Sequence, residues 1–340
     1  MIQIKKATHY FSANSYEIVE TLDLGTSSHI FILQKDNQQI IGKVPRIPDK
    51  MNLRPEYQLL EYLHNSHLKG HVPTPIKWVP ELGGFLMEYR ELRYPTQMER
   101  EDRRYVAELA RLVRELHKLD IPDIPGLPDD RPEAGRAVIR RFEEDFRSLQ
   151  RENAHWKRLS TADRRRLEKV REVSHVYAQL AENLGGTGVY GAWEGLESTL
   201  IHGDLAGDNI MLTRQVGLDP TSFMAQDRPA RTAIHTGGGV EETLILLDWG
   251  SARIGSALAD VANLLVYQEW SPACVQCFME IYYQDDRAMI EKTRSILEVL
   301  LRLVRYRACL LSLEWLETEG ETGLDNFGRD FFERQVQLLD

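Results

Sequence analysis

The sequence predicts an α+β protein of two lobes, in which a small antiparallel β-sheet with one main helix precedes a larger, mostly helical part. The chain has 340 residues, which is too long for one small hydrophobic core. β-rich runs separated by turn residues come first, and a helical period dominates from about residue 99. We therefore expect an N-terminal lobe over 1–90 and a C-terminal lobe over 91–340.

The first lobe is expected to contain three strands, one helix and two more strands. Residues 16–47 show β-rich runs, and the polar turn 35–38 lies between two of them. Residues 54–64 repeat apolar side chains at a helical period. Two more strands are predicted at 76–79 and 85–89. This order favours a compact sheet with its helix inserted after the third strand.

The second lobe is expected to be mostly helical. Apolar side chains follow one helix face over 106–117, and helices are predicted again from about residue 258 to the end. Residues 133–184 predict two more helices that are dense in Arg and Glu. Because the acids match the bases there, we interpret these residues as solvated helix faces rather than as contacts with nucleic acid.

Residues 213–243 separate two predicted strands, 209–212 and 244–247, and show little periodicity. A connection of this length inside a compact domain is either functional or disordered. Its triple glycine, 237–239, lacks the strand-to-helix context and the Gly-Lys-Ser/Thr of a phosphate-binding loop. We therefore expect a flexible hairpin insertion.

Composition excludes several classes of protein. The net charge of −10 argues against a general nucleic-acid binder, and no apolar run approaches the length of a membrane helix. The start of the chain shows no signal-like apolar run, so we expect a cytoplasmic protein. Cys274 and Cys277 are spaced like metal ligands, but no second pair exists and the flanking sequence looks helical, so we expect them to be buried small apolar residues.

Two acidic motifs carry the chemistry. Residues 202–209 read His-Gly-Asp-Leu-Ala-Gly-Asp-Asn, and residues 246–250 read Leu-Leu-Asp-Trp-Gly. Asp204 is placed to orient a hydroxyl and accept its proton, whereas Asn209 and Asp248 offer the hard oxygen ligands that suit Mg²⁺. Phosphoryl transfer needs this positioning and charge neutralisation more than covalent catalysis. A single such motif predicts only a capped turn, but both in this order favour phosphoryl transfer.

These motifs, followed by Gly255 and Asp260, resemble the aminoglycoside phosphotransferase and choline kinase family, which has the fold of the protein kinases. The resemblance covers the order of parts over about residues 22–265. Gly-Lys-Val-Pro-Arg at 42–46, followed by Glu56, looks most like the macrolide phosphotransferase branch. The resemblance implies Mg²⁺-dependent transfer of the γ-phosphoryl group of ATP or GTP to a hydroxyl.

The resemblance also implies how the first lobe binds the nucleotide. Lys43 would contact the α- and β-phosphates, and Glu56 would hold it, with Glu61 as a competing partner. Lys43 would be costly to bury unpaired, but two unrelated surface charges are the alternative. A loop with a single glycine occupies the place of the phosphate loop; an ordinary hairpin turn is the alternative for it. Its candidate residues are Gly25, Thr26, Ser27 and Ser28.

Further residues receive supporting roles by the same resemblance. Glu88 and Tyr89 fall at the lobe junction, where backbone groups would bind a purine, although they could equally be the exposed end of a core strand. His202 and Asp260 would brace the catalytic loop. The family often has Gly-Asp-Pro where this chain has Gly-Ser-Ala at 255–257, and this departure bears on the turn near the metal.

The acceptor is left open by the sequence. An acidic stretch over 314–325 would suit a cationic sugar, but helix surface is the simpler interpretation. Aromatic residues could surround a quaternary amine or a macrolide, although we expect them in the core. These are Tyr267, Trp270, Tyr282, Tyr283 and Trp315.

The leading hypothesis is an enzyme that phosphorylates an antibiotic of the aminoglycoside or macrolide type. A metabolic kinase for choline, homoserine or a sugar derivative is the alternative. A non-catalytic, nucleotide-binding regulator is a hypothesis of another class. A protein kinase is disfavoured because no Ala-Pro-Glu follows Asp248. The expected partners are a nucleoside triphosphate and a small hydroxyl compound, with no nucleic acid or membrane; the oligomeric state stays open.

Overall fold

A computed structural model describes six segments of the chain and four single positions between 161 and 168. The segments are 2–22, 27–130, 198–214, 234–235, 241–322 and 327–338. The chain forms two compact units, which we describe separately. Unit 1 combines Met1–Pro128 with His202–Arg253, and unit 2 combines Asp129–Ile201 with Ile254–Asp340. The lobe boundary expected near residue 90 remains a prediction.

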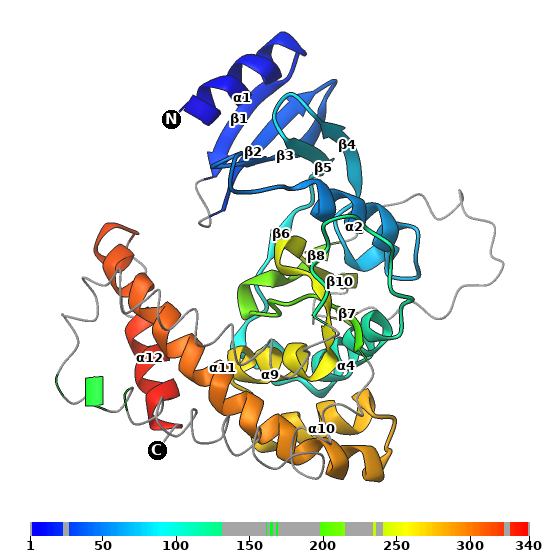
Figure 1. Ribbon diagram of the computed structural model, residues 1–340, viewed down its shortest axis with the longest axis vertical. Coiled ribbons are helices and arrows are strands. Elements are labelled where there is room, and N and C mark those ends of the chain that lie inside the picture. The colour runs from blue at the N-terminus through cyan, green and yellow to red at the C-terminus, as the bar shows by residue number, and fades with distance from the viewer. Residues whose placement is uncertain are drawn as a thin grey trace. The chain divides into compact units, whose positions relative to one another are not determined.

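Unit 1 opens with a five-stranded antiparallel sheet, as predicted (Figure 1). The strand order is β1-β2-β3-β5-β4. Asp36 and Asn37 join β2 to β3 with φ of 49° and 63°, the two positive φ values that a tight type I′ hairpin requires. The strands are β1 (Glu17–Leu22), β2 (Ser28–Lys35), β3 (Gln38–Pro45), β4 (Pro75–Val79) and β5 (Gly84–Glu88).

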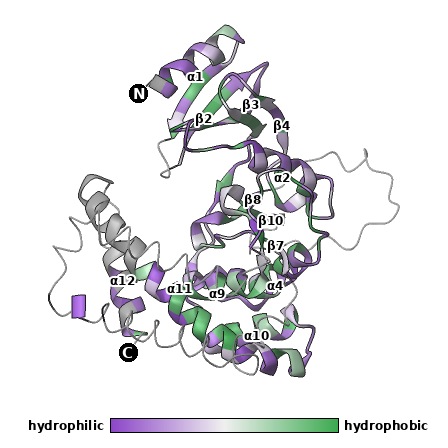
Figure 2. Ribbon diagram, in the orientation of Figure 1, coloured by the Kyte–Doolittle hydropathy of each residue, from purple (hydrophilic) through white to green (hydrophobic). Residues whose placement is uncertain are grey.

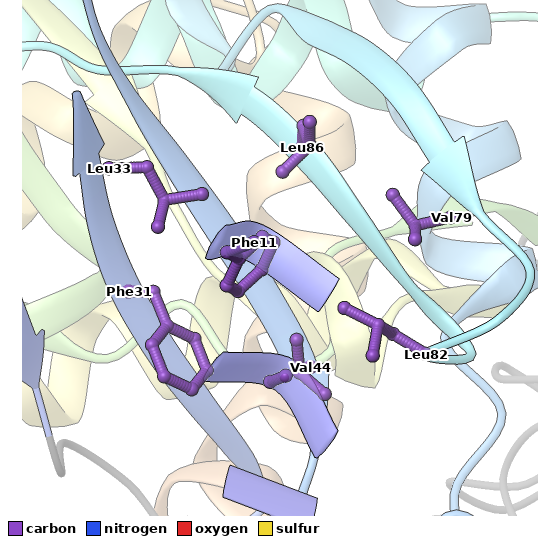
Figure 3. Close-up of a cluster of buried hydrophobic side chains, with 8 residues drawn as sticks. Phe11, Phe31, Leu33, Val44, Val79, Leu82 and Leu86 are labelled. Carbon is purple, nitrogen blue, oxygen red and sulfur yellow. The ribbon is translucent and has the colours of Figure 1, made fainter. Parts of the chain in front are cut away.

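A helix that is not predicted from the sequence, α1 (Ile2–Ala13), lies on one face of this sheet (Figures 1 and 3). Ala7 and Phe11, one helical turn apart, are fully buried against the sheet. Their spacing was the available sequence signal, but the helix is polar elsewhere and its apolar face is narrow. The other members of this cluster are Leu82, in the turn between β4 and β5, and the sheet residues Phe31, Leu33, Val44, Val79 and Leu86.

The predicted helix at 54–64 is α2 (Arg54–His64). Pro55 lies in its first turn, where a missing N–H costs nothing. Leu59, Leu60 and Leu63 are buried, and so is Glu56 in the first turn. α2 packs against β4 and against the short helix η4 (Trp249–Ser251). The sequence period therefore predicts the helix, and its packing brings Glu56 into the interior.

A second sheet in unit 1 holds the strands on either side of the predicted hairpin insertion. Its order is β6-β8-β10-β9. β8 and β10 pair antiparallel from Ile210 and Leu246 to Arg214 and Glu242, so residues 215–240 connect a hairpin. Most of that connection lies outside the described residues, and its flexibility remains a prediction. The strands are β6 (Leu92–Arg93), β8 (Ile210–Arg214), β9 (Ile234–His235) and β10 (Glu241–Leu246).

The rest of unit 1 consists of short and regular helices. The helix expected over 106–117 is α4, which begins at an Asp102 side chain that accepts a hydrogen bond from Arg104 N–H. The elements are η1 (Lys69–His71), α3 (Gln97–Arg100), α4 (Arg103–His117) and η3 (Gly207–Asn209).

Unit 2 is mainly helical, as expected. Its long helix α11 packs against α9, α10 and α12, and Figure 2 shows hydrophobic residues along α9, α10 and the adjoining part of α11. A two-stranded sheet joins β7 to β11. The elements are β7 (Ser198–Ile201), β11 (Arg253–Ser256), α9 (Ala257–Gln268), α10 (Pro272–Tyr282), α11 (Arg287–Thr322) and α12 (Phe327–Gln337). No described helix combines the length and the apolarity needed to cross a membrane.

Several of the aromatic residues considered for an acceptor site lie in the core of unit 2. Trp270 and Tyr282 are buried, and Tyr267 stacks on Phe331 with ring centroids 5.6 Å apart. The side chains of the acidic stretch 314–325 lie outside the described residues, and so do the two helices predicted within 133–184, apart from four positions between 161 and 168.

Candidate active site

Lys43 stands at the centre of the site. It lies on β3, and its side chain is only 6% exposed. Its Nζ lies 2.7 Å from Glu56 Oε1 and 2.7 Å from Asp248 Oδ1. Glu56 is therefore the helix carboxylate that holds the lysine, whereas Glu61 is exposed on the same helix. The three side chains come from a strand, a helix and a loop that are distant in the sequence.

Charge pairing controls the ionisation of this triad. Burial by itself lowers the pKa of Lys43, but Glu56 and Asp248 outweigh burial and raise it. Burial raises the pKa of Glu56 in spite of Lys43, and Glu56 Oε2 is buried without a hydrogen-bond donor among the described residues. For Asp248, burial acts to raise the pKa, but Lys43 prevails and lowers it. Lys43 thus keeps Asp248 ionised.

Asp248 can bind a second partner. Its side chain is 52% exposed, although one carboxylate oxygen contacts Lys43. Its backbone adopts the left-handed conformation, with φ of 54° and ψ of 72°, which is uncommon for a residue other than glycine. Trp249 is buried next to it and donates its Nε1–H to Leu246 O at 3.0 Å. This anchor holds the chain on both sides of Asp248.

His202 connects the two acidic motifs. Its ring lies 4.5 Å from that of Trp249, and the residue is fully buried. Nε2 lies 2.8 Å from Leu247 O, and Nδ1 lies 3.3 Å from Asp204 N. A backbone N–H can only donate, so Nδ1 accepts and Nε2–H donates to Leu247. The neutral ring therefore ties Asp204 to the residue before Asp248.

Asn209 provides a second tie between the same segments. Its Nδ2 donates to Asp204 O at 2.8 Å and lies 3.2 Å from Asp204 Oδ2. Its backbone carbonyl accepts the N–H of Leu247 at 2.9 Å. Because the amide nitrogen is committed to Asp204, Oδ1 is the part of the side chain left for a ligand. Asn209 thus orients Asp204 and offers an oxygen at once.

Gly203 permits the close packing of the catalytic loop. Its φ is +80°, and a Cβ at this position would lie 2.2 Å from Ser251 O. No side chain can occupy that space without moving the backbone. The glycine of the motif is therefore required by geometry, because residues 202–204 pack directly on the segment after Asp248.

Asp208 is a candidate site residue that is not predicted from the sequence, although it lies inside the motif. It is exposed on η3. Loss of hydration, followed by the charges of Asp204 and Asp248, raises the pKa of its carboxyl group. The run Gly-Asp-Asn at 207–209 contained the signal, since a second carboxylate beside Asn209 adds negative charge to the site.

The structure places the remaining candidate residues in different environments. Ser28 is buried in β2, and its hydroxyl lies 3.9 Å from Met51 Sδ. Ser27 O accepts the N–H of Arg46 at 3.0 Å. Gly25 and Thr26 lie outside the described residues. A phosphate contact of this loop therefore remains a prediction, and for Ser28 it would come from the backbone, because the hydroxyl points elsewhere.

Glu88 ends β5 and is exposed, with Arg90 Nη2 3.2 Å from its Oε2. Its backbone N–H is committed to Thr74 O at 2.9 Å, so Glu88 has only its carbonyl left for a purine. Tyr89 follows it and is half-buried. Asp260 is fully buried in the first turn of α9 in unit 2, which is consistent with a structural role.

A model of the phosphotransferase enzyme family (APH) matches residues 18–222, which is more than half of the chain. The chain belongs to the phosphotransferase enzyme family. The match runs from β1 through the catalytic loop, so it includes Lys43, Glu56, Asp204 and Asn209. This phosphotransferase is an enzyme that acts on hydroxyl groups, which favours the catalytic hypothesis over a non-catalytic regulator. No match was found among curated protein sequences.

Solved structures show that the phosphotransferase has the kinase-like fold predicted from its motifs. Choline kinase LicA from Streptococcus pneumoniae has 16% identity and a TM-score of 0.60, over 100% of this chain and 99% of that chain. Aminoglycoside phosphotransferase APH(2'')-Ib bound to ADP has 16% identity and a TM-score of 0.54, over 98% of this chain and 96% of that chain. Macrolide 2'-phosphotransferase MphH from Brachybacterium faecium has 15% identity and a TM-score of 0.54, over 98% of this chain and 97% of that chain.

Proposed function

We propose that this phosphotransferase transfers the γ-phosphoryl group of ATP or GTP to a hydroxyl of a small molecule, with Asp204 as the base. One observation carries the proposal: Leu247 is held on one side by His202 and on the other by Asn209. This backbone link fixes the loop of Asp204 beside Asp248. The arrangement brings a base, two hard oxygen donors and a buried cation into one unit.

The nucleotide side of the site would be built on Lys43. A buried ammonium group with two carboxylate partners keeps its charge, and it can exchange one partner for phosphate oxygens. Asp248 is the exchangeable partner because it is half-exposed, whereas Glu56 is buried. The carbonyl of Glu88 and the side chain of Tyr89 would contact the purine, and the loop over 25–28 would cover the phosphates. The structure of APH(2'')-Ib with ADP is consistent with nucleotide binding in this fold.

The donor set fits Mg²⁺. Asp248 supplies an ionised, half-exposed carboxylate, and Asn209 supplies Oδ1. Among the described residues, no group of three or more His, Cys, Asp and Glu side chains could hold a metal alone. That is the pattern expected for Mg²⁺, which takes one or two protein ligands and completes its shell with phosphate oxygens and water. When bound, the ion would neutralise charge on the phosphates.

The protein groups would then position the acceptor. Asp204 accepts the proton of the attacking hydroxyl, while the Asn209 amide orients its carboxylate and His202 holds its backbone N–H. General base catalysis of this kind contributes about 10²–10⁴-fold to the rate. No covalent intermediate on the protein is required, because the hydroxyl attacks the phosphorus atom directly.

The acceptor class is proposed from the resemblance in the sequence rather than from the described residues. We favour an antibiotic of the aminoglycoside or macrolide type, and choline, homoserine or a sugar derivative is the alternative. Similar folds serve a choline kinase, an aminoglycoside phosphotransferase and a macrolide phosphotransferase. A screen of these compounds with ATP and with GTP, read as the mass gain of one phosphoryl group, would identify the acceptor and the donor.

The test of the mechanism is Asp204→Asn. This change keeps the size of the side chain but removes the base, so transfer to the acceptor found in the screen should fall by about 10²–10⁴-fold. Binding of Mg·ATP should stay within about threefold of the wild type, since the nucleotide contacts are elsewhere. Asp208→Asn is the matched control: it removes a nearby charge without removing the base. Wild-type turnover in Asp204→Asn would refute the proposal.

A further inference from the structure

The residue next to Lys43 on β3 is a glycine, and the structure leaves no room there for a side chain. Gly42 precedes the lysine on β3, and a Cβ at Gly42 would lie 2.9 Å from Cζ of Phe11 and 3.2 Å from Cδ1 of Leu33. Real Cβ atoms essentially never come within 3.0 Å of a neighbouring atom, so the contact with Phe11 would force a shift, whereas the contact with Leu33 would only be tight. The ring of Phe11 therefore occupies the space where a side chain at Gly42 would lie, so α1 approaches β3 closely at the residue before the lysine.

The Phe11 ring is not free to move away. It is fully buried and makes edge-to-face contacts with Phe31 at 5.3 Å, Tyr10 at 5.8 Å and Tyr16 at 6.1 Å between ring centroids. Interdigitated cores of this kind respond to a change of even one methylene group. A methyl group added at Gly42 would therefore meet a ring that its neighbours hold in place.

Both ends of α1 are fastened to the sheet lobe. Near its start, Gln3 Nε2 donates to Leu82 O at 3.0 Å. At its end, Tyr16 N donates to Phe11 O at 2.9 Å, and Lys35 Nζ donates to Asn14 O at 3.1 Å. The helix is therefore fixed to the sheet, and it keeps the Phe11 ring in place against Gly42.

A shift of Gly42 would reach Lys43 directly. Successive side chains on a strand point to opposite faces, so Phe11 presses on one face of β3 and Lys43 projects from the other. β5 lies close to the same residue, since a Cβ at Gly84 would be only 2.4 Å from Lys43 O. The two 2.7 Å contacts of Nζ leave little tolerance for displacement.

We propose that Phe11 is a positioning residue for Lys43: through Gly42, it sets the depth of β3 and hence the place of the ammonium group between Glu56 and Asp248. This inference rests on the proposed role of Lys43 in binding the phosphates of the nucleotide. It assigns to α1 a part in nucleotide affinity, although no residue of that helix touches the triad in the described contacts.

The experiment enlarges the side chain at position 42 and shortens the one at position 11. Gly42→Ala, Phe11→Leu and the double variant are titrated with Mg·ATP, and the midpoint of thermal unfolding is recorded for each. Gly42→Ala should weaken Mg·ATP binding by about tenfold, because the added methyl group displaces β3. The double variant should return to within about threefold of the wild type, because leucine lacks the Cζ that clashes.

Leu82→Ala is the control for general loss of packing. Leu82 belongs to the same cluster but lies away from Phe31 and Leu33 (Figure 3). This variant should unfold at a lower temperature and bind Mg·ATP like the wild type. The inference is overturned if Gly42→Ala binds normally, if the double variant binds no better than Gly42→Ala, or if Leu82→Ala weakens binding equally.

Lys43→Ala separates this inference from the proposed function. If Mg·ATP binding drops in Lys43→Ala but the size exchange shows no rescue, only the role of Phe11 is wrong. If Lys43→Ala binds Mg·ATP like the wild type, the proposed nucleotide site is wrong, and the role assigned to Phe11 is wrong with it.

Discussion

Single residues of the catalytic loop decide whether the two motifs can meet. Leu247 has no reactive group, yet its backbone links the two motifs. Its N–H donates to Asn209 O, and its carbonyl accepts a hydrogen bond from His202 Nε2. Gly203 allows those ties to form, because its left-handed backbone brings the loop against Ser251. The residues between the chemical groups therefore matter as much as the groups themselves.

Gly203→Ala is predicted to damage both stability and turnover. A positive φ at a residue with a Cβ costs about 1–2 kcal/mol, and the clash with Ser251 O adds to this cost. We expect the free energy of unfolding to fall by about 2 kcal/mol or more, measured by urea titration, and kcat to fall with it. Gly70→Ala is the matched control, since nothing lies within 4 Å of its Cβ position. Equal stability of the two variants would contradict the prediction.

At the scale of elements, Arg93 joins three of them. From β6 its guanidinium contacts Glu99 in the first turn of α3, and Nε lies 2.8 Å from Glu242 Oε1 on β10. A second contact runs from Nη2 to Glu242 Oε2. Thr96 caps α3, and the Glu99 side chain accepts its backbone N–H in return, which completes a capping box. The base of the hairpin insertion is thereby fixed to the rest of unit 1.

This cluster predicts a dependence of stability on pH. Hydrogen bonding to Arg93, against some burial, lowers the pKa of Glu99 from 4.5 to about 2. A lowered pKa means that the stabilisation is complete above pH 4.5 and is lost as pH falls toward about 2. Glu99→Gln should therefore be less stable than the wild type at neutral pH, and the difference should shrink in acid. Urea unfolding along a pH series checks this, with exposed Glu20→Gln as control; a constant difference would disprove the assignment.

The edge strands of the five-stranded sheet have features that discourage pairing with a strand of another chain. β1 and β4 are the outer strands, and each pairing contains a register shift, at Ile18/Glu20 and at Pro75/Lys77. Bulges, prolines and charges on an edge discourage pairing with another chain. The β-rich runs between turn residues predicted these strands, whereas the pairing in the sheet decides which of them lie at its edges.

At the scale of the whole molecule, the nucleotide should stabilise the fold through its metal. Saturation with Mg·ATP at 100 times Kd corresponds to about 2.7 kcal/mol of added stability. Asp248→Asn should lose most of this gain, because it removes the ionised ligand, while ATP with a chelator should stabilise both proteins weakly and equally. Thermal unfolding with each addition measures this. An undiminished gain in Asp248→Asn would place the metal elsewhere.

The hairpin insertion offers a second test on this scale. Arg214 and Glu242 are partners in register, so a short turn can replace residues 216–239. We expect the shortened protein to fold, with the KM of the acceptor changed more than the KM of the nucleotide, because β8 runs directly from Asn209 to this connection. Steady-state kinetics with the acceptor from the screen gives both constants. Unchanged acceptor kinetics would make the segment a passive insertion.

Much of the fold and the identity of the acidic motifs follow from the sequence alone. The β-rich runs, the polar turn over 35–38 and the helical period of 54–64 are local properties, and the spacing of Asp204, Asn209 and Asp248 is a property of short segments. Local patterns are readable because the backbone has few allowed conformations and each has its own period.

Only the tertiary structure decided which groups meet. Lys43 and Asp248 are 205 positions apart, and nothing local shows that they form one ion pair or that Glu56 is preferred to Glu61. The hydrogen bond of His202 to Leu247 and the close approach of Phe11 to Gly42 are likewise contacts between distant segments. Such contacts depend on how whole elements pack, since burial and close approach are set by all neighbours together.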